Sequence, residues 1–207
     1  MRTDDLITLL SQTPPRRPPL RLSLAVVAAI AVTMVVNTLV LGLRPDIAVL
    51  PLSMVYKSTV LLALAALAGG ILTRIARPLA TVNRGVIAVV LFALLVAGSL
   101  GWEWSHAAPA AILHSFALPN FPFCLGAVTI YGTLAAGALT GLMRFYAPAN
   151  EGRAAAAIGF AAAAAGAVGY SIHCPIDSPT FVVVAYGLPI AWVTLASRML
   201  FVRLIRW

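Results

Sequence analysis

Six long apolar runs constrain this chain more than any other feature of its sequence. A membrane core about 30 Å thick requires about 20 apolar residues per helix, because each helical residue advances about 1.5 Å. The runs that meet this requirement are Leu22–Leu43, Pro51–Ile75, Val82–Leu100, Phe121–Phe145, Ala154–Ile172 and Phe181–Phe201. With 61% apolar and 10% charged residues, the composition excludes a water-soluble globular domain. We therefore predict an all-α integral membrane protein in which six transmembrane helices contact the lipid bilayer.

The charged residues predict the orientation of these helices. Twelve of the fourteen cationic residues fall on one side of the predicted spans. They are Arg2, Arg16, Arg17, Arg21, Arg74, Arg77, Arg84, Arg144, Arg153, Arg198, Arg203 and Arg206. The other side holds Arg44, with Lys57 just inside the second span, and the acidic residues Asp46, Glu103 and Asp177. Because cationic loops stay in the cytoplasm, both termini are predicted to be cytoplasmic. The arginines form no single basic stripe, so we expect no nucleic-acid binding.

The chain divides into a cytoplasmic tail, residues 1–21, and a six-helix domain, residues 22–207. Thr3 can cap a helix over residues 3–13, and Asp4 and Asp5 suit the positive end of its dipole. A Pro/Arg linker follows this helix. No cleavage signal of the A-x-A type follows the first apolar run, so we expect the first span to be retained.

The tail helix has one apolar face, formed by Leu6, Ile7, Leu9 and Leu10. A helix of this length is marginal in water and needs a surface to fold against. That surface is either the inner leaflet of the membrane or a groove on a soluble protein. The acidic start of the helix disfavours the first alternative, because its carboxylates would meet anionic lipid.

Small residues predict how the spans pack. Gly166 and Gly169 in the fifth span, and Gly137 and Gly141 in the fourth, allow close approach of neighbouring helices. We expect these two spans to pack centrally, and we favour internal packing over homodimerisation for the glycines. The longest loop, residues 101–120, is expected to lie along the membrane interface.

Two cysteines are predicted to share one level of the membrane. Cys124 lies near the start of the inward-running fourth span, and Cys174 lies just past the outward-running fifth. His173, when protonated, would lower the pKa of the neighbouring thiol. Three alternatives stay open: a structural disulfide, a pair that reports oxidants, and a soft-metal site made by Cys124, Cys174, His173 and His114. No cofactor is expected beyond such transient metal binding.

Two charged residues near the same side need partners. Lys57 is expected either to extend towards the outer surface or to pair with a carboxylate of the outer side, such as Glu103 or Asp46. Asp177 or Ser178 is expected to cap the sixth span, and capping alone would account for Asp177. The sequence carries no nucleophilic triad and no glycine-rich phosphate loop, so we predict that the protein is not an enzyme.

The whole chain resembles the NrsF family of six-span membrane anti-sigma factors of Gram-negative bacteria. The resemblance is carried by Thr3-Asp4-Asp5-Leu6-Ile7, by Cys124, by His173-Cys174-Pro175-x-Asp177-Ser178-Pro179-x-Phe181, and by the final Arg206-Trp207. One departure is Ile176, where the family favours an acidic residue.

The resemblance implies a multi-pass protein of the bacterial inner membrane that sequesters an extracytoplasmic-function sigma factor. It also implies that Cys124 and Cys174, with His173 beside them, sense metal or oxidative stress. Contact with the sigma factor is assigned to Asp4, Asp5 and the apolar face of the tail helix. The alternatives are a small membrane transporter and a thiol-redox membrane protein.

Overall fold

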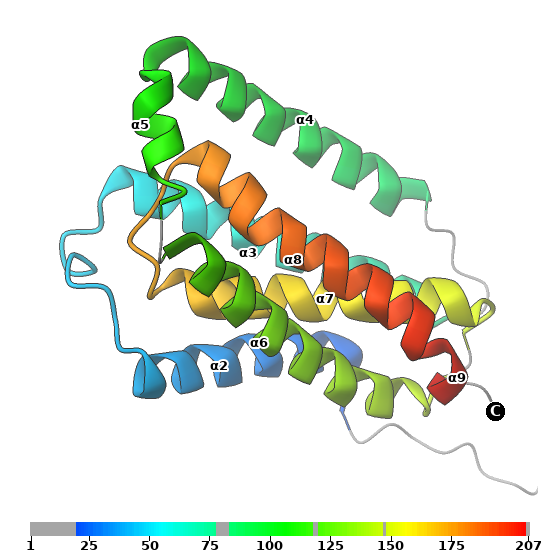
Figure 1. Cartoon of the computed structure of the whole chain (residues 1–207). Coiled ribbons are helices and arrows are strands. Elements are labelled where there is room, and N and C mark those ends of the chain that lie inside the picture. Colours follow the sequence, from blue (N-terminus) through cyan, green and yellow to red (C-terminus); the bar gives the residue numbers. More distant parts are fainter. Residues whose placement is uncertain (1–19, 78–82, 118–119, 147, 206–207) are drawn as a thin grey trace, which may run out of the picture.

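The computed structural model describes residues 20–77, 83–117, 120–146 and 148–205. Every regular element in these residues is a helix (Figure 1). The helices are α2 (Leu22–Val40), α3 (Leu52–Ile75), α4 (Asn83–His106), α5 (Pro109–His114), α6 (Asn120–Met143), α7 (Glu151–Ser171), α8 (Pro179–Leu200) and α9 (Val202–Ile205). Six of them, α2, α3, α4, α6, α7 and α8, are long and apolar enough to cross a membrane, which confirms the six predicted spans. The predicted tail helix over residues 3–13 lies outside the described residues.

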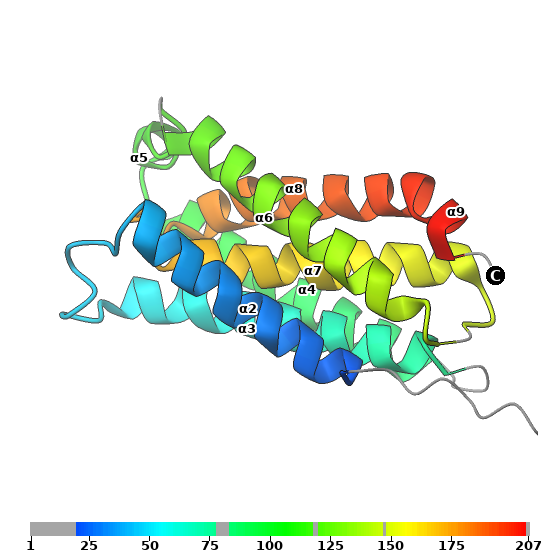
Figure 2. The ribbon, with the colours of Figure 1, turned by 90° about the horizontal axis from the view of Figure 1, so that it is seen from below.

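The six long helices run alternately in opposite directions. The described chain therefore begins and ends at the same end of the bundle (Figure 2). We call the opposite end, where residues 41–51, 107–117 and 172–178 connect the helices, the outer end. That this end faces away from the cytoplasm remains a prediction from the charge distribution.

Helix α7 forms the centre of the bundle, between α2, α3, α6 and α8 (Figure 1). About nine-tenths of its most apolar stretch is buried, as predicted for the span richest in small residues. A Cβ added at Gly166 would lie 2.9 Å from the backbone nitrogen of Gly132 in α6. The two helices therefore approach until their backbones touch, which only glycine allows at these positions.

The expected role of Gly137 and Gly141 in internal packing is wrong. Both glycines are exposed, and a Cβ added at either would meet no atom within 4 Å. Helix α6 instead turns Gly132, Ala136 and Thr140 inwards, at a spacing of four residues. These three residues share one face of the helix, and Gly137 lies on a different face.

Residues 101–106 are helical rather than part of the expected interfacial loop. Helix α4 extends to His106, whose ring stacks on that of Trp102 at a centroid distance of 3.9 Å. This helix lies at the edge of the bundle, and none of its most apolar stretch is buried inside the protein (Figure 1). The extra turns bring Glu103 to the start of α8, where it makes the contacts described below.

Candidate functional site

The two cysteines meet at the outer end of the bundle. Cys124 lies in the second turn of α6, and Cys174 lies in the segment that connects α7 to α8. Their Sγ atoms are 3.5 Å apart, and each residue is 1% exposed. The Tyr170 hydroxyl lies 3.2 Å from the Cys124 sulfur. Antiparallel packing of α6 and α7 produces this meeting, because it brings the start of one helix beside the end of the other.

Both cysteines are free in this structure. A disulfide bond is about 2.05 Å long, so the sulfur atoms would have to approach by about 1.5 Å to form one. A shift of this size lies within the reach of a connecting segment and one helix turn. The two sulfur atoms are therefore close enough for a small local shift to join them.

The four residues considered for a metal site do not gather in one place. In the described part of the chain, no group of three or more His, Cys, Asp and Glu side chains is arranged to hold a metal ion. His173 places its Nδ1 3.1 Å from the Gly42 carbonyl oxygen and packs its ring near that of Tyr170. His114 is exposed on α5. The structure thus brings together the two sulfur ligands of the predicted set.

A buried lysine holds the backbone around Cys174. Lys57, in the second turn of α3, is completely buried. Its Nζ donates to the carbonyl oxygens of Cys174, at 2.6 Å, and Ile176, at 3.2 Å. Its third partner is the Asp177 carboxylate, 2.6 Å away. The predicted pairing of Lys57 with a carboxylate of the outer side is confirmed, but the partner is Asp177 and not Glu103 or Asp46, because the 172–178 segment folds over Lys57 and supplies a nearer carboxylate.

Arg44 completes an ion-pair cluster that comprises Arg44, Asp46, Lys57 and Asp177. Its guanidinium group contacts Asp177 at 2.8 and 3.0 Å and Asp46 at 2.6 and 2.7 Å. It also donates to the Cys174 carbonyl oxygen at 3.3 Å. The cluster holds two cations and two carboxylates, so its formal charges balance. The sequence signal for Arg44 was its position, since it is the only arginine on the predicted outer side.

The ion pairs determine the ionisation of the acidic members of the cluster. Burial disfavours the Asp177 carboxylate, but hydrogen bonds from Arg44 and Lys57 prevail and lower its pKa below the ordinary value. The expectation that capping alone accounts for Asp177 is therefore wrong. Ser178 caps α8 instead, since its hydroxyl accepts from the Phe181 amide.

Glu103 holds the start of α8 from the other side. Its carboxylate accepts from the backbone nitrogen of Thr180 at 2.7 Å and from the Thr180 hydroxyl at 2.6 Å. The Trp104 indole also donates to that hydroxyl, at 3.0 Å. Sequence reasoning missed this contact, because it placed Glu103 in a loop.

The pKa of the Cys174 thiol is lowered to about 6. The largest cause is the hydrogen bond with the Cys124 thiol, and the positive charge of Lys57 also favours the thiolate. Together these effects outweigh burial, which opposes ionisation. Cys174 is therefore the better nucleophile for an oxidant and the better ligand for a soft metal at neutral pH.

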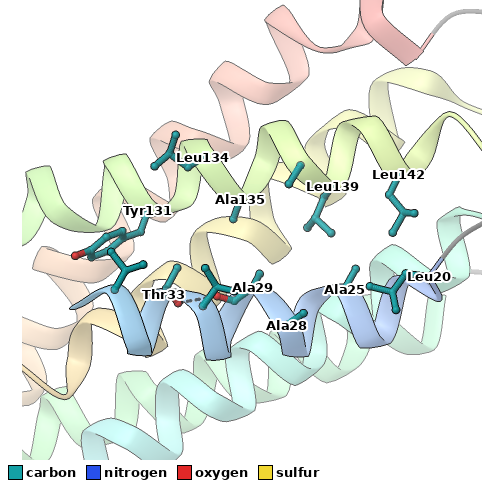
Figure 3. Close-up of a pocket in the computed structure, with 13 residues that line it drawn as sticks. Leu20, Ala25, Ala28, Ala29, Thr33, Tyr131, Leu134, Ala135, Leu139 and Leu142 are labelled. Atoms are coloured by element: carbon teal, nitrogen blue, oxygen red, sulfur yellow. Dashed lines mark hydrogen bonds between the residues drawn. The ribbon is translucent and has the colours of Figure 1, made fainter. Parts of the chain in front are cut away.

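An apolar groove lies away from the cysteines and carries no such chemistry. It has a volume of about 470 Å³, lies between α2 and α6, and is lined mainly by alanine and leucine side chains (Figure 3). The Thr33 hydroxyl in the groove already donates to backbone carbonyls of its own helix. The groove therefore offers an alkyl surface of the kind that lipid chains cover.

These features define a six-helix membrane protein with a buried thiol pair and an ion-pair cluster at one end. The sequence profile of the NrsF family, described as negative regulator of sigma F, matches residues 6–207. The chain therefore belongs to the NrsF family of negative regulators of a sigma factor. The match begins at Leu6, so Asp4 and Asp5 precede it. No curated protein and no solved structure matches this chain.

Proposed function

We propose that this protein sequesters an extracytoplasmic-function sigma factor at the bacterial inner membrane and releases it when the Cys124–Cys174 pair reacts. Family membership supports the regulatory role. The observation that carries the sensing role is the 3.5 Å separation of two buried, free thiols. They lie at the end of the bundle opposite the chain ends, where an extracytoplasmic signal would arrive.

The sigma factor is proposed to bind the cytoplasmic tail. Asp4 and Asp5 would contact cationic groups, and the face formed by Leu6, Ile7, Leu9 and Leu10 would enter an apolar groove on the partner. The sigma factor would thereby be kept away from RNA polymerase. The Pro/Arg linker lies outside the described residues, and its proline content predicts a stiff, extended spacer between this helix and α2.

Oxidation by peroxide proceeds in two balanced steps. The Cys174 thiolate attacks one peroxide oxygen and becomes a sulfenic acid, while the other oxygen leaves as water after protonation. The Cys124 thiol then attacks the sulfenic sulfur, which forms the disulfide and releases a second water. Cadmium would act differently, because it would bind the Cys174 thiolate and displace the proton of the Cys124 thiol to bind that sulfur as well. His173, next to Cys174, would assist either reaction as a polar neighbour.

Release requires that the reacted and unreacted forms bind the sigma factor with different free energies. A difference of about 1–3 kcal/mol changes an affinity about 5- to 150-fold. Helix α6 carries Cys124 and packs against α7 and α8 along the bundle. A shift of α6 at the outer end would therefore be transmitted to the inner end through its packing against α7 and α8.

Co-purification tests the binding half of the proposal. The full-length protein and a form lacking residues 1–13 are purified from the native host in mild detergent, and bound proteins are identified by mass spectrometry. Recovery of one sigma factor with the full-length form alone supports tail binding. Recovery with both forms moves the contact to the inner loops, and recovery with neither, under reducing and metal-free conditions, refutes the proposal.

A double substitution, Cys124→Ser with Cys174→Ser, tests the sensing half. The wild-type complex is expected to release its sigma factor under peroxide or cadmium, and the double variant is expected to retain it. Normal release by the double variant would show that the thiols are not the sensor.

A further inference from the structure

Lys57 is costly to bury, and the thiol chemistry described above uses only its positive charge and not its contacts with the backbone. All three N–H donors of its ammonium group are occupied, by the carbonyl oxygens of Cys174 and Ile176 and by Asp177. None of its surface is exposed. Removing an ammonium group from water carries a large penalty, and an apolar residue of similar volume often replaces a buried ion pair without loss of stability. Stability alone is therefore a poor explanation for a lysine at this position.

The contacts of Lys57 join one reactive residue to one helix. Cys174 lies in residues 174–178, which belong to no helix, so its position depends on groups that contact its backbone. Lys57 makes the shortest of these contacts, 2.6 Å to the Cys174 carbonyl oxygen. It extends from α3, which packs against the central helix α7 and runs to the inner end of the bundle at Ile75.

Arg44 holds the same segment from the connection between α2 and α3. Its backbone amide donates to the Ile172 carbonyl oxygen at 3.3 Å, in addition to its side-chain contacts with Cys174 and Asp177. The 172–177 segment is therefore attached to α3 and to the connection that precedes it. On the other side, Cys174 faces Cys124 of α6 across 3.5 Å.

We propose that Lys57 is a positioning residue that couples the state of the Cys124–Cys174 pair to helix α3. This inference rests on the proposed sensing function. When the sulfur atoms approach by about 1.5 Å to form a disulfide, the Cys174 backbone moves towards α6. The carbonyl oxygens that hold Lys57 move with it, and the outer turns of α3 must follow or lose these hydrogen bonds. In either case, the reaction at the thiols changes the helix that leads to the inner arginines Arg74 and Arg77.

The test compares oxidation with release in the same sample. The full-length protein in complex with its sigma factor is oxidised with peroxide in mild detergent. The oxidised fraction is measured by denaturation and alkylation with a mass-tagged maleimide, and the released fraction by separation of free sigma factor. Release is then expressed per oxidised molecule, so that a change in oxidation rate does not affect the result.

Lys57→Met is expected to lower release per oxidised molecule at least tenfold. Because this variant leaves Asp177 with one cation fewer, it is paired with the double variant Lys57→Met, Asp177→Asn, which restores the charge balance. The double variant is expected to recover thermal stability but not release. A purely structural role for Lys57 would predict that stability and release recover together.

Glu103→Gln provides the matched control. It weakens a separate polar attachment at this end, the contact of Glu103 with Thr180, without touching the 172–177 segment. Its release per oxidised molecule is expected to stay within twofold of wild type. Wild-type release in either folded Lys57 variant would overturn the coupling role and leave the proposed function intact. If the wild type itself oxidised without release, the proposed function would fail.

Discussion

Replacing Asp177 by asparagine is expected to destabilise the protein by about 3–5 kcal/mol, because it removes one partner from a buried ion pair. The side chain of Asp177 is 8% exposed, and that of Lys57, 2.6 Å away, is not exposed at all. Asparagine keeps the volume and one acceptor oxygen, so the loss reports the missing charge. Lys57 keeps two carbonyl contacts, which cannot neutralise its charge. The measurement is reversible unfolding in mixed micelles, followed by circular dichroism.

Asp46→Asn is the matched control for Asp177→Asn. Both carboxylates pair with Arg44, but the Asp46 side chain is 44% exposed. Water and salt screen an exposed pair, so the control is expected to lose far less stability. Equal losses in the two variants would refute the argument that burial, rather than pairing as such, gives Asp177 its importance.

The same carboxylate predicts a dependence of stability on pH. Because the pKa of Asp177 is lower in the folded protein than its ordinary value of 3.8, the folded state favours the ionised form. The resulting stability is fully present above the ordinary value and is lost as the pH falls through the lowered one. Wild type is therefore expected to lose stability below about pH 4, and Asp177→Asn to lose less over the same range. Parallel acid-unfolding curves for the two proteins would contradict this assignment.

Two further predictions concern packing and reactivity. Gly166→Ala is expected to cost about 1–3 kcal/mol, because its Cβ would lie 2.9 Å from the Gly132 backbone. Gly137→Ala should be neutral or slightly stabilising, because no neighbouring atom lies near this position. Equal losses of stability in the two variants, measured by unfolding in micelles, would contradict the finding that α6 packs through Gly132 and not Gly137. The rate at which peroxide forms the Cys124–Cys174 disulfide is expected to rise with pH through about 6 and then level off, as the Cys174 thiolate becomes fully populated. Acid quenching followed by alkylation measures this rate, and a steady rise up to pH 9 would indicate an ordinary thiol.

Predictions from sequence succeeded for features that each segment determines by itself. A transmembrane helix satisfies its own backbone hydrogen bonds, so length and apolarity were sufficient to predict the six spans. Ser178 and Pro179 similarly predicted the start of α8, because capping depends on neighbours in the chain. The alternation of six spans placed Cys124 and Cys174 at one end of the bundle before any contact was known.

The contact partners of individual side chains were predicted less well. They depend on the rotation of each helix about its own axis and on where the connecting segments fold. Asp46 and Glu103 were reasonable partners for Lys57 by membrane level, but the 172–178 segment placed Asp177 closer. Glu103 was assigned to a loop because the third apolar run ends at Leu100, yet helix α4 continues to His106.

The sequence by itself determined the membrane class, the number of spans and the common level of the two thiols, since these follow from composition and order along the chain. Only the tertiary structure decided that α6 packs through Gly132 rather than Gly137 and that the two sulfur atoms lie 3.5 Å apart. It also decided that a buried lysine holds the reactive segment. These features depend on distances between residues far apart in sequence, which close packing of several helices determines together.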